Sequence, residues 1–165
     1  VNMLNVGVPV DLREHVPRNA KISIKLELDT TPPPGATTEV RTRLQPLPFQ
    51  VRLYDLPSLF AGKLHAVLYR DWKSRVKGRD FYDFVWYVSR DTPVNLAHLE
   101  ARMRQSGYDS ASPLTLGELK EILKERVRTI DIPAAAAEAR PFLRDPREIE
   151  LWSEAFFLEL CERVR

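Results

Sequence analysis

Hydrophobic and polar residues alternate in the first third of the chain. Between residues 22 and 29 every second side chain is aliphatic, and its neighbours are polar or charged. The same alternation returns at residues 40–44 and 49–53, after a proline-rich segment at residues 30–36. A period of two is typical of half-buried strands, and consecutive prolines force a loop. We therefore expect three strands joined by short loops, in an antiparallel sheet with one polar face.

After residue 54 the spacing of apolar residues changes to three and four, which indicates amphipathic helices. Two helices are expected at about residues 55–71 and 77–89. Four further helix starts are predicted at Asn95, Thr115, Asp131 and Pro146. Thr115 and Glu118 fit the capping box, in which each side chain binds the backbone N–H of the other residue.

The expected fold class is α+β, with a short antiparallel sheet in residues 1–54 and a C-terminal helical bundle in residues 55–165. The chain has 165 residues, of which 44% are hydrophobic and 29% charged, as is typical of a folded domain. No apolar run approaches the ~20 residues that span a bilayer, and residues 1–14 lack a secretory signal pattern. The single cysteine, Cys161, excludes an intrachain disulfide. We expect a cytoplasmic protein with no membrane partner.

Positive charge gathers in one part of the chain, although the formal net charge is only +2. Six cations stand near one acid, Asp71: they are Lys63, Arg70, Lys73, Arg75, Lys77 and Arg79. One interpretation is a basic patch that faces phosphate groups. The other is a solvated helix end and loop, which is what such charge runs usually form. The sequence leaves both interpretations open.

The stretch K-G-R-D-F-Y-D-F, residues 77–84, also has two interpretations. On the predicted helix Asp80 and Asp83 border the apolar stripe, while Lys63 lies inside the stripe of the preceding helix. In a structural interpretation the lysine reaches water by its long stem, and Arg79 pairs with Asp83 four residues on. In a functional interpretation Asp80 meets Lys63 across a helix hairpin and orients the lysine toward an anionic ligand.

These two helices contain motifs in a specific order and spacing. The segment A-G-K-L-H-A-V-L-Y-R is followed by K-G-R-D-F-Y-D-F-V-W-Y. Together they resemble the AbiEii/AbiGii family of nucleotidyltransferase toxins, within the DNA polymerase β-like superfamily. The third motif of the family, K-x-x-A with a later arginine, is matched by Lys63, Ala66 and Arg70. The fourth motif, K-x-R-D-x-Y-D, is matched by Lys77, Arg79, Asp80, Tyr82 and Asp83.

The resemblance extends from about residue 22 to residue 160, but one motif is missing. In the superfamily a Gly-Ser followed by D-x-D holds the nucleotide triphosphate and two metal ions, and this chain contains neither pattern. The chain is then the C-terminal part of a longer enzyme or a degenerate relative. Its start at Val1 and its strand-first layout favour the longer enzyme. We expect the chain alone to lack transferase activity.

The resemblance implies a role for each matched residue. Lys63, Asp80 and Asp83 would be catalytic; Arg70, Lys77 and Arg79 would bind substrate phosphate; and Asp29, in K-L-E-L-D, would bind metal. The intact enzyme would move a nucleotide from an NTP to an RNA acceptor such as a tRNA end, using Mg²⁺. It would act in a toxin–antitoxin or phage-defence system with a cognate antitoxin. The alternative is a non-catalytic interaction module that binds RNA or an antitoxin.

Overall fold

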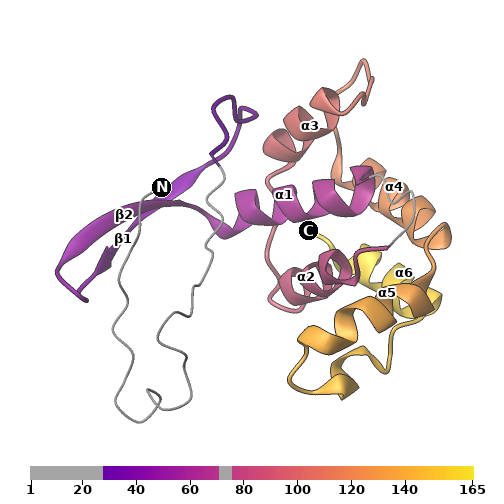
Figure 1. Cartoon of the computed structure of the whole chain (residues 1–165). Coiled ribbons are helices and arrows are strands. Elements are labelled where there is room, and N and C mark those ends of the chain that lie inside the picture. The colour runs from indigo at the N-terminus through magenta and orange to yellow at the C-terminus, as the bar shows by residue number, and fades with distance from the viewer. Residues whose placement is uncertain (1–27, 71–75) are drawn as a thin grey trace, which may run out of the picture. The chain divides into compact units, whose positions relative to one another are not determined.

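The computed structural model describes residues 28–70 and 76–165. Contacts divide the chain into two compact units, residues 1–32 and residues 33–165. All the described strands and helices belong to the second unit (Figure 1). The strand predicted at residues 22–29 lies almost entirely outside the described residues.

Strands β1 (Thr38–Arg43) and β2 (Phe49–Tyr54) form an antiparallel hairpin. Its register sets Thr38 opposite Tyr54 and Arg43 opposite Phe49. The hairpin confirms both predicted strands and their direction. The expected buried face is absent from these two strands, because aliphatic and aromatic side chains such as Val40 and Phe49 remain exposed. A two-stranded hairpin supplies no second layer of its own to cover either face.

A polar cluster holds the beginning of α1 (Leu56–Tyr69). The Asp55 carboxylate caps this helix by accepting the Ser58 N–H at 2.9 Å, and it accepts the Thr37 hydroxyl at 2.5 Å. The Ser58 hydroxyl in turn accepts the Thr37 N–H at 2.9 Å and the Asn95 amide at 3.1 Å. Asn95 also donates to the carbonyl of Gly35 at 2.9 Å. We call Thr37, Asp55, Ser58 and Asn95 the start cluster.

The remaining helical elements follow in chain order. They are α2 (Gly78–Val88), α3 (Leu96–Gln105), α4 (Leu116–Arg128), α5 (Ile132–Ala139), the 3₁₀ turns η2 (Arg140–Phe142) and η3 (Pro146–Ile149), and α6 (Glu154–Arg163). Asn95, Thr115 and Asp131 cap α3, α4 and α5, as predicted. The prediction that Pro146 begins the last helix is wrong. Pro146 begins one 3₁₀ turn, and α6 begins after Ser153, whose hydroxyl accepts the Phe156 N–H.

The predicted capping box at α4 forms only in half. The Thr115 hydroxyl accepts the Glu118 N–H at 3.2 Å, as expected of the capping residue. The Glu118 carboxylate instead accepts the hydroxyl of Tyr108 at 2.6 Å. A bond to a distant side chain replaces the local return bond, so Glu118 joins α4 to the segment before it.

Helix α1 packs against α2, α3 and α4 (Figure 1). Aromatic rings contribute to the core between these helices. The apolar stripe predicted on α1 is confirmed at Phe60, Leu64 and Val67, which are almost completely buried, but its first predicted member, Leu56, is 39% exposed. The ring of Phe60 stacks on that of Tyr87 with centroids 4.9 Å apart. Phe81 meets the edge of Phe157 on α6 at 5.6 Å, so the α2 stripe is also core. This packing fixes the side of α1 that faces α2.

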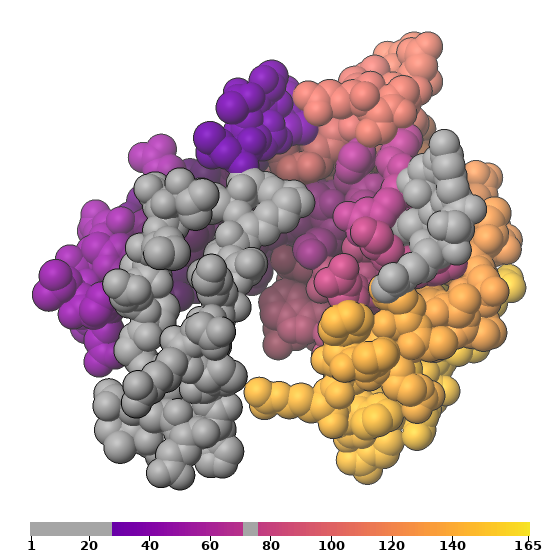
Figure 2. All heavy atoms as spheres, viewed as in Figure 1, coloured from indigo at the N-terminus to yellow at the C-terminus, as the bar shows by residue number. Residues whose placement is uncertain are grey.

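A close contact joins the beginning of α2 to α5. A Cβ atom added at Gly78 would lie 1.9 Å from the backbone oxygen of Ala135, a distance that no side chain tolerates. Ala135 and Ala139 are buried, and their methyl groups leave room for this approach. The two helices touch in the space-filling view (Figure 2). The glycine in K-G-R-D and the alanine-rich tract thus bring η2 to the beginning of α2.

Candidate functional site

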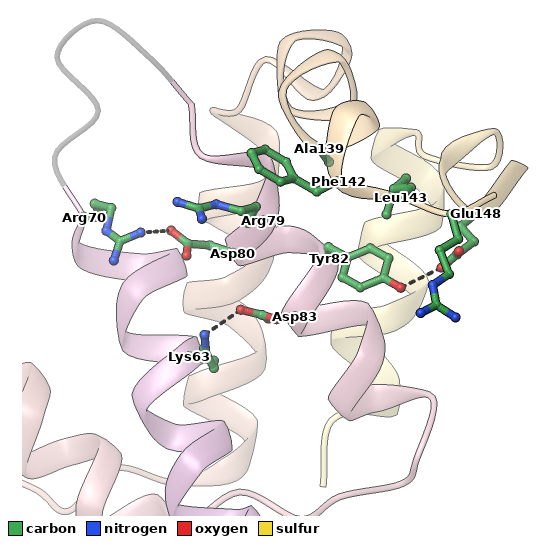
Figure 3. A pocket seen from close by; sticks show the side chains of 11 residues that line it. Lys63, Arg70, Arg79, Asp80, Tyr82, Asp83, Ala139, Phe142, Leu143 and Glu148 are labelled. Atoms are coloured by element: carbon green, nitrogen blue, oxygen red, sulfur yellow. Dashed lines mark hydrogen bonds and ion pairs between the residues drawn. The ribbon is translucent and has the colours of Figure 1, made fainter. Parts of the chain in front are cut away.

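A cavity of about 560 Å³ lies where α1, α2 and the segment from α5 to η3 meet (Figure 3). Helices α1 and α2 contribute the side chains of Lys63, Arg70, Arg79, Asp80, Tyr82 and Asp83. Five of the six are charged, and the cavity has the size of common small-molecule sites. The two motif helices therefore present their charges to one cavity.

Two ion pairs join α1 to α2 beside this cavity. The ammonium of Lys63 lies 2.6 Å from the Asp83 carboxylate, and the guanidinium of Arg70 lies 2.5 Å from the Asp80 carboxylate. Arg70, directly after α1, meets Asp80 near the beginning of α2, whereas Lys63 within α1 meets the later Asp83. The two helices therefore run antiparallel, as predicted. The predicted partner of Lys63 was Asp80, and the structure pairs Lys63 with Asp83 instead. Asp80 stands at the beginning of α2, beside the end of α1, where Arg70 is the nearer cation.

The Asp80 carboxyl group is buried, with 9% of its side chain exposed. Burial raises the pKa of Asp80, because a desolvated carboxylate is unfavourable, while the charges of Arg70 and Lys63 oppose this shift. Arg70 itself keeps 40% of its side chain exposed. A perturbed carboxyl group next to an accessible cation in a cavity is a common feature of functional sites.

Arg79 lies on the same helix but has a different environment. Its guanidinium stands over the ring of Phe142, 5.3 Å from the ring centroid. The predicted pairing of Arg79 with Asp83 is wrong, because Asp83 binds Lys63. Within the part of the chain that the structure describes, neither Arg79 nor Arg144 forms an ion pair. The cavity therefore has two cations whose charges no described carboxylate neutralises.

The opposite wall comes from the segment between α5 and η3. It contributes Ala139, Phe142, Leu143, Arg144 and Glu148. The hydroxyl of Tyr82 donates to the Glu148 carboxylate at 2.6 Å, which ties this wall to α2. No motif in the sequence predicted this wall. The one available signal was Phe142 in R-P-F-L-R, an aromatic residue set between arginines in a proline-containing connection.

The family identity follows from comparison with known protein families. A family model described as nucleotidyl transferase AbiEii toxin, type IV toxin–antitoxin system, matches residues 5–158. The chain belongs to this family. The match confirms the resemblance inferred from the two motifs. No curated protein and no solved structure matches the chain.

Two other predicted site residues of this AbiEii family member are not among the described residues that line the cavity. Lys77 precedes α2 as its capping residue, is half-buried, and accepts the Asp80 N–H on its carbonyl at 3.0 Å. Asp29 is exposed, accepts the Thr31 N–H at 3.0 Å, and belongs to the first compact unit. Lys73 and Arg75 lie outside the described residues. Among the described members of the basic run, Lys63, Arg70 and Arg79 line the cavity.

The described residues do not fit a Mg²⁺ site. Residues 28–70 and 76–165 contain no group of three His, Cys, Asp or Glu side chains placed to hold a metal ion. Mg²⁺ prefers octahedral oxygen coordination, but Asp80 and Asp83 already bind cationic side chains. Among the same residues, no helix has the length and apolar character needed to cross a membrane.

Proposed function

We propose that the cavity binds the triphosphate of an NTP. The observation that carries this proposal is the convergence of Lys63, Arg70 and Arg79 on one cavity, with Arg79 lacking a carboxylate partner among the described residues. An arginine has five N–H donors and a lysine ammonium three, so one carboxylate contact leaves donors for phosphate oxygens. Asp83 and Asp80 then act as positioning residues, since they hold Lys63 and Arg70 in place.

We further propose the reaction that this binding serves. In a protein that also carries the Gly-Ser and D-x-D motif, the bound NTP donates its nucleotide to an RNA end similar to that of tRNA. The family match supports the nucleotidyl transfer and the toxin–antitoxin setting. The RNA acceptor rests on the motif resemblance and on the cationic lining of the cavity. A cognate antitoxin counteracts the toxin, and the system serves in defence against phage. The 165 residues alone bind NTP but do not transfer its nucleotide.

Nucleotide binding tests the first proposal directly. Each of the four labelled NTPs is titrated with the chain, with and without Mg²⁺, and Arg79→Gln is compared with Arg43→Gln. Arg43 is exposed on β1 and lies outside the cavity lining. Loss of a charged hydrogen bond weakens binding by about tenfold or more. Arg79→Gln should show this loss and Arg43→Gln should not. Absence of saturable binding by any NTP would contradict the proposal.

Transfer to RNA tests the second proposal. The chain is incubated with labelled NTP, Mg²⁺ and a tRNA pool, and label in the RNA is measured. We expect no label, because the sequence has no D-x-D pair to place metals at a triphosphate. Robust Mg²⁺-dependent labelling would show that other residues of this chain perform the chemistry.

A non-catalytic RNA-binding or antitoxin-binding module is the second candidate. The ion pairs of Lys63 and Arg70 favour it, since they hold both cations in place without a ligand. Such a module should retain tRNA weakly, with retention that falls steeply as salt rises. Replacing Lys73 and Arg75 with glutamine should reduce the salt slope without unfolding the chain. No tRNA binding at low salt would leave an antitoxin as the remaining partner.

A further inference from the structure

The cavity has two chemically different ends. Lys63 and Arg70 border one end, whereas Phe142 and Leu143 border the other (Figure 3). Arg144 and Glu148 line the same wall as Phe142 and Leu143. Cations suffice for an inorganic polyphosphate, so phosphate binding leaves the aromatic and aliphatic side chains of this wall unexplained. A nucleotide combines an anionic tail with a flat aromatic base, and it matches both ends.

Among the described phenylalanines Phe142 is the most exposed, ahead of Phe49 on β2, which is 47% exposed. The fully buried phenylalanines, Phe60, Phe81, Phe84 and Phe157, form the core, whereas Phe142 remains 62% exposed. It ends the turn η2, directly after Pro141, and a 3₁₀ turn with proline restricts the backbone that carries the ring. The backbone that carries the ring is therefore restricted, and the ring itself remains accessible.

Arg79 connects the two ends of the cavity. Its guanidinium carbon lies over the Phe142 ring, 5.3 Å from the ring centroid, and the five N–H donors of a guanidinium lie in its own plane. Those donors can bind a phosphate oxygen while the cation–π contact with the ring is kept. The arrangement puts a phosphate-binding group and an aromatic surface side by side.

We propose that the nucleotide base stacks on the exposed part of the Phe142 ring, with its phosphates toward Arg79, Lys63 and Arg70. This inference rests on the proposed NTP binding and adds the residue that recognises the base. Every base has a flat aromatic surface, so stacking favours nucleotides over polyphosphate without choosing among the four bases. Phe142 is thus a binding residue contributed by a segment that lies more than 50 residues beyond the sequence motifs.

The experiment compares two ligands and three variants. Inorganic tripolyphosphate and ATP are each titrated with the chain and with Phe142→Ala, Phe142→Trp and Leu151→Ala. Leu151 is the matched control, because it is 73% exposed in the same part of the chain and lies outside the cavity lining. Loss of stacking on one aromatic side chain weakens binding by about tenfold.

The expected pattern is specific to stacking. ATP should bind about tenfold more tightly than tripolyphosphate, and Phe142→Ala should remove that difference without weakening tripolyphosphate. Phe142→Trp and Leu151→Ala should retain it. In the original chain, nuclear Overhauser contacts should join the Phe142 ring protons to the adenine H8 or H2 proton.

Two results would overturn the inference, and they differ in what else they affect. If tripolyphosphate and ATP bind equally, and Phe142→Ala changes neither, the stacking inference fails while triphosphate binding stands. If neither ligand binds, the proposed function fails and the stacking inference fails with it.

Discussion

The two ends of α1 carry polar groups of opposite character. At its beginning the start cluster sends its hydrogen bonds to backbone groups and to its own members, and Ser58 is almost fully buried. Toward its end Lys63 and Arg70 meet carboxylates only through side chains, and both cations border a cavity. The first arrangement completes a helix cap. The second leaves donors available for a ligand.

The aspartates at the two ends differ in the same way. Burial opposes ionisation of Asp55, but hydrogen bonds from Thr37 and Ser58 outweigh it and lower the pKa of Asp55. Burial dominates at Asp80 and raises its pKa in spite of Arg70. The protein thus stabilises the charge of Asp55 and tolerates the charge of Asp80. A group that is unfavourable for folding, beside a cavity, is better explained by ligand binding than by stability.

The largest expected loss of stability is that of Gly78→Ala, which should disrupt the cavity wall formed by α2 and α5 and leave the start cluster intact. A methyl group at this position would collide with the backbone of Ala135, so α2 and α5 must separate. We expect a loss of about 3 kcal/mol in the free energy of unfolding, measured with urea, because backbone cannot yield as a side chain can. Nucleotide binding should also fall, since the wall with Phe142 would shift.

The matched control is Gly117→Ala on α4, where an added Cβ would meet nothing within 4 Å. This change should be neutral or raise the free energy of unfolding by up to about 1 kcal/mol, because alanine restricts the unfolded chain. Equal effects of the two substitutions would show that the contact with Ala135 does not build the cavity.

A smaller loss is expected from Ser58→Ala, which breaks the start cluster alone. The Thr37 N–H and the Asn95 amide would lose a buried acceptor, in two hydrogen bonds that are themselves partly buried. We expect the free energy of unfolding to fall by about 1–3 kcal/mol. Nucleotide affinity, measured well below the unfolding temperature, should stay unchanged. A marked loss of affinity would mean that the start cluster contributes to the site.

Lys63→Gln, a change in the cavity lining, should lower nucleotide affinity and leave stability nearly unchanged, the reverse of Ser58→Ala. Lys63 and Asp83 keep 45% and 32% of their side chains exposed, and such ion pairs contribute at most about 1 kcal/mol to folding. Nucleotide affinity should nevertheless fall about tenfold, as for any lost charged contact. Lys124→Gln is the control, because Lys124 also pairs with carboxylates but lies on α4 outside the cavity lining. If both variants bind nucleotide equally well, Lys63 is structural.

The start cluster and the cavity also differ in how far the sequence could predict them. A helix cap binds an N–H three residues on, so Asp55, Asn95 and Thr115 could be recognised from local sequence. The hairpin strands followed from alternation in the same way. The beginning of the last helix was harder to predict, because Pro146 opens the 3₁₀ turn η3, and Ser153 caps α6 only after that turn.

Partners across the cavity depend on how two helices are rotated and shifted, which no local pattern records. The charges of Lys63, Asp80 and Asp83 were predicted to gather, but their pairing required the position of Arg70 at the end of α1. The wall with Phe142 depends on the close approach of α5 to α2, and a single glycine makes that approach possible. The motifs therefore located half of the cavity.

The smallest expected effect, and the finest test of the comparison, is the pH dependence of Asp55→Asn and Asp80→Asn. The lowered pKa of Asp55 gives stability that is present above the usual aspartate value of 3.8 and is lost as pH falls through the folded pKa. The raised pKa of Asp80 gives the opposite sign: its ionised form disfavours folding, and this cost disappears as pH falls toward 3.8.

Urea unfolding of the original chain and both variants between about pH 3 and pH 7 distinguishes these two opposite pH dependences of the free energy of unfolding. Relative to Asp55→Asn, the original chain should lose stability as pH falls below 3.8. Relative to Asp80→Asn, it should gain stability as pH falls toward 3.8 from above, while asparagine keeps an oxygen for Arg70. Saturating NTP should enlarge the second difference alone, because phosphate charge placed beside Asp80 further disfavours its ionised form. Slopes of the same sign at both positions would remove the contrast between a structural and a ligand-binding aspartate on which the site rests.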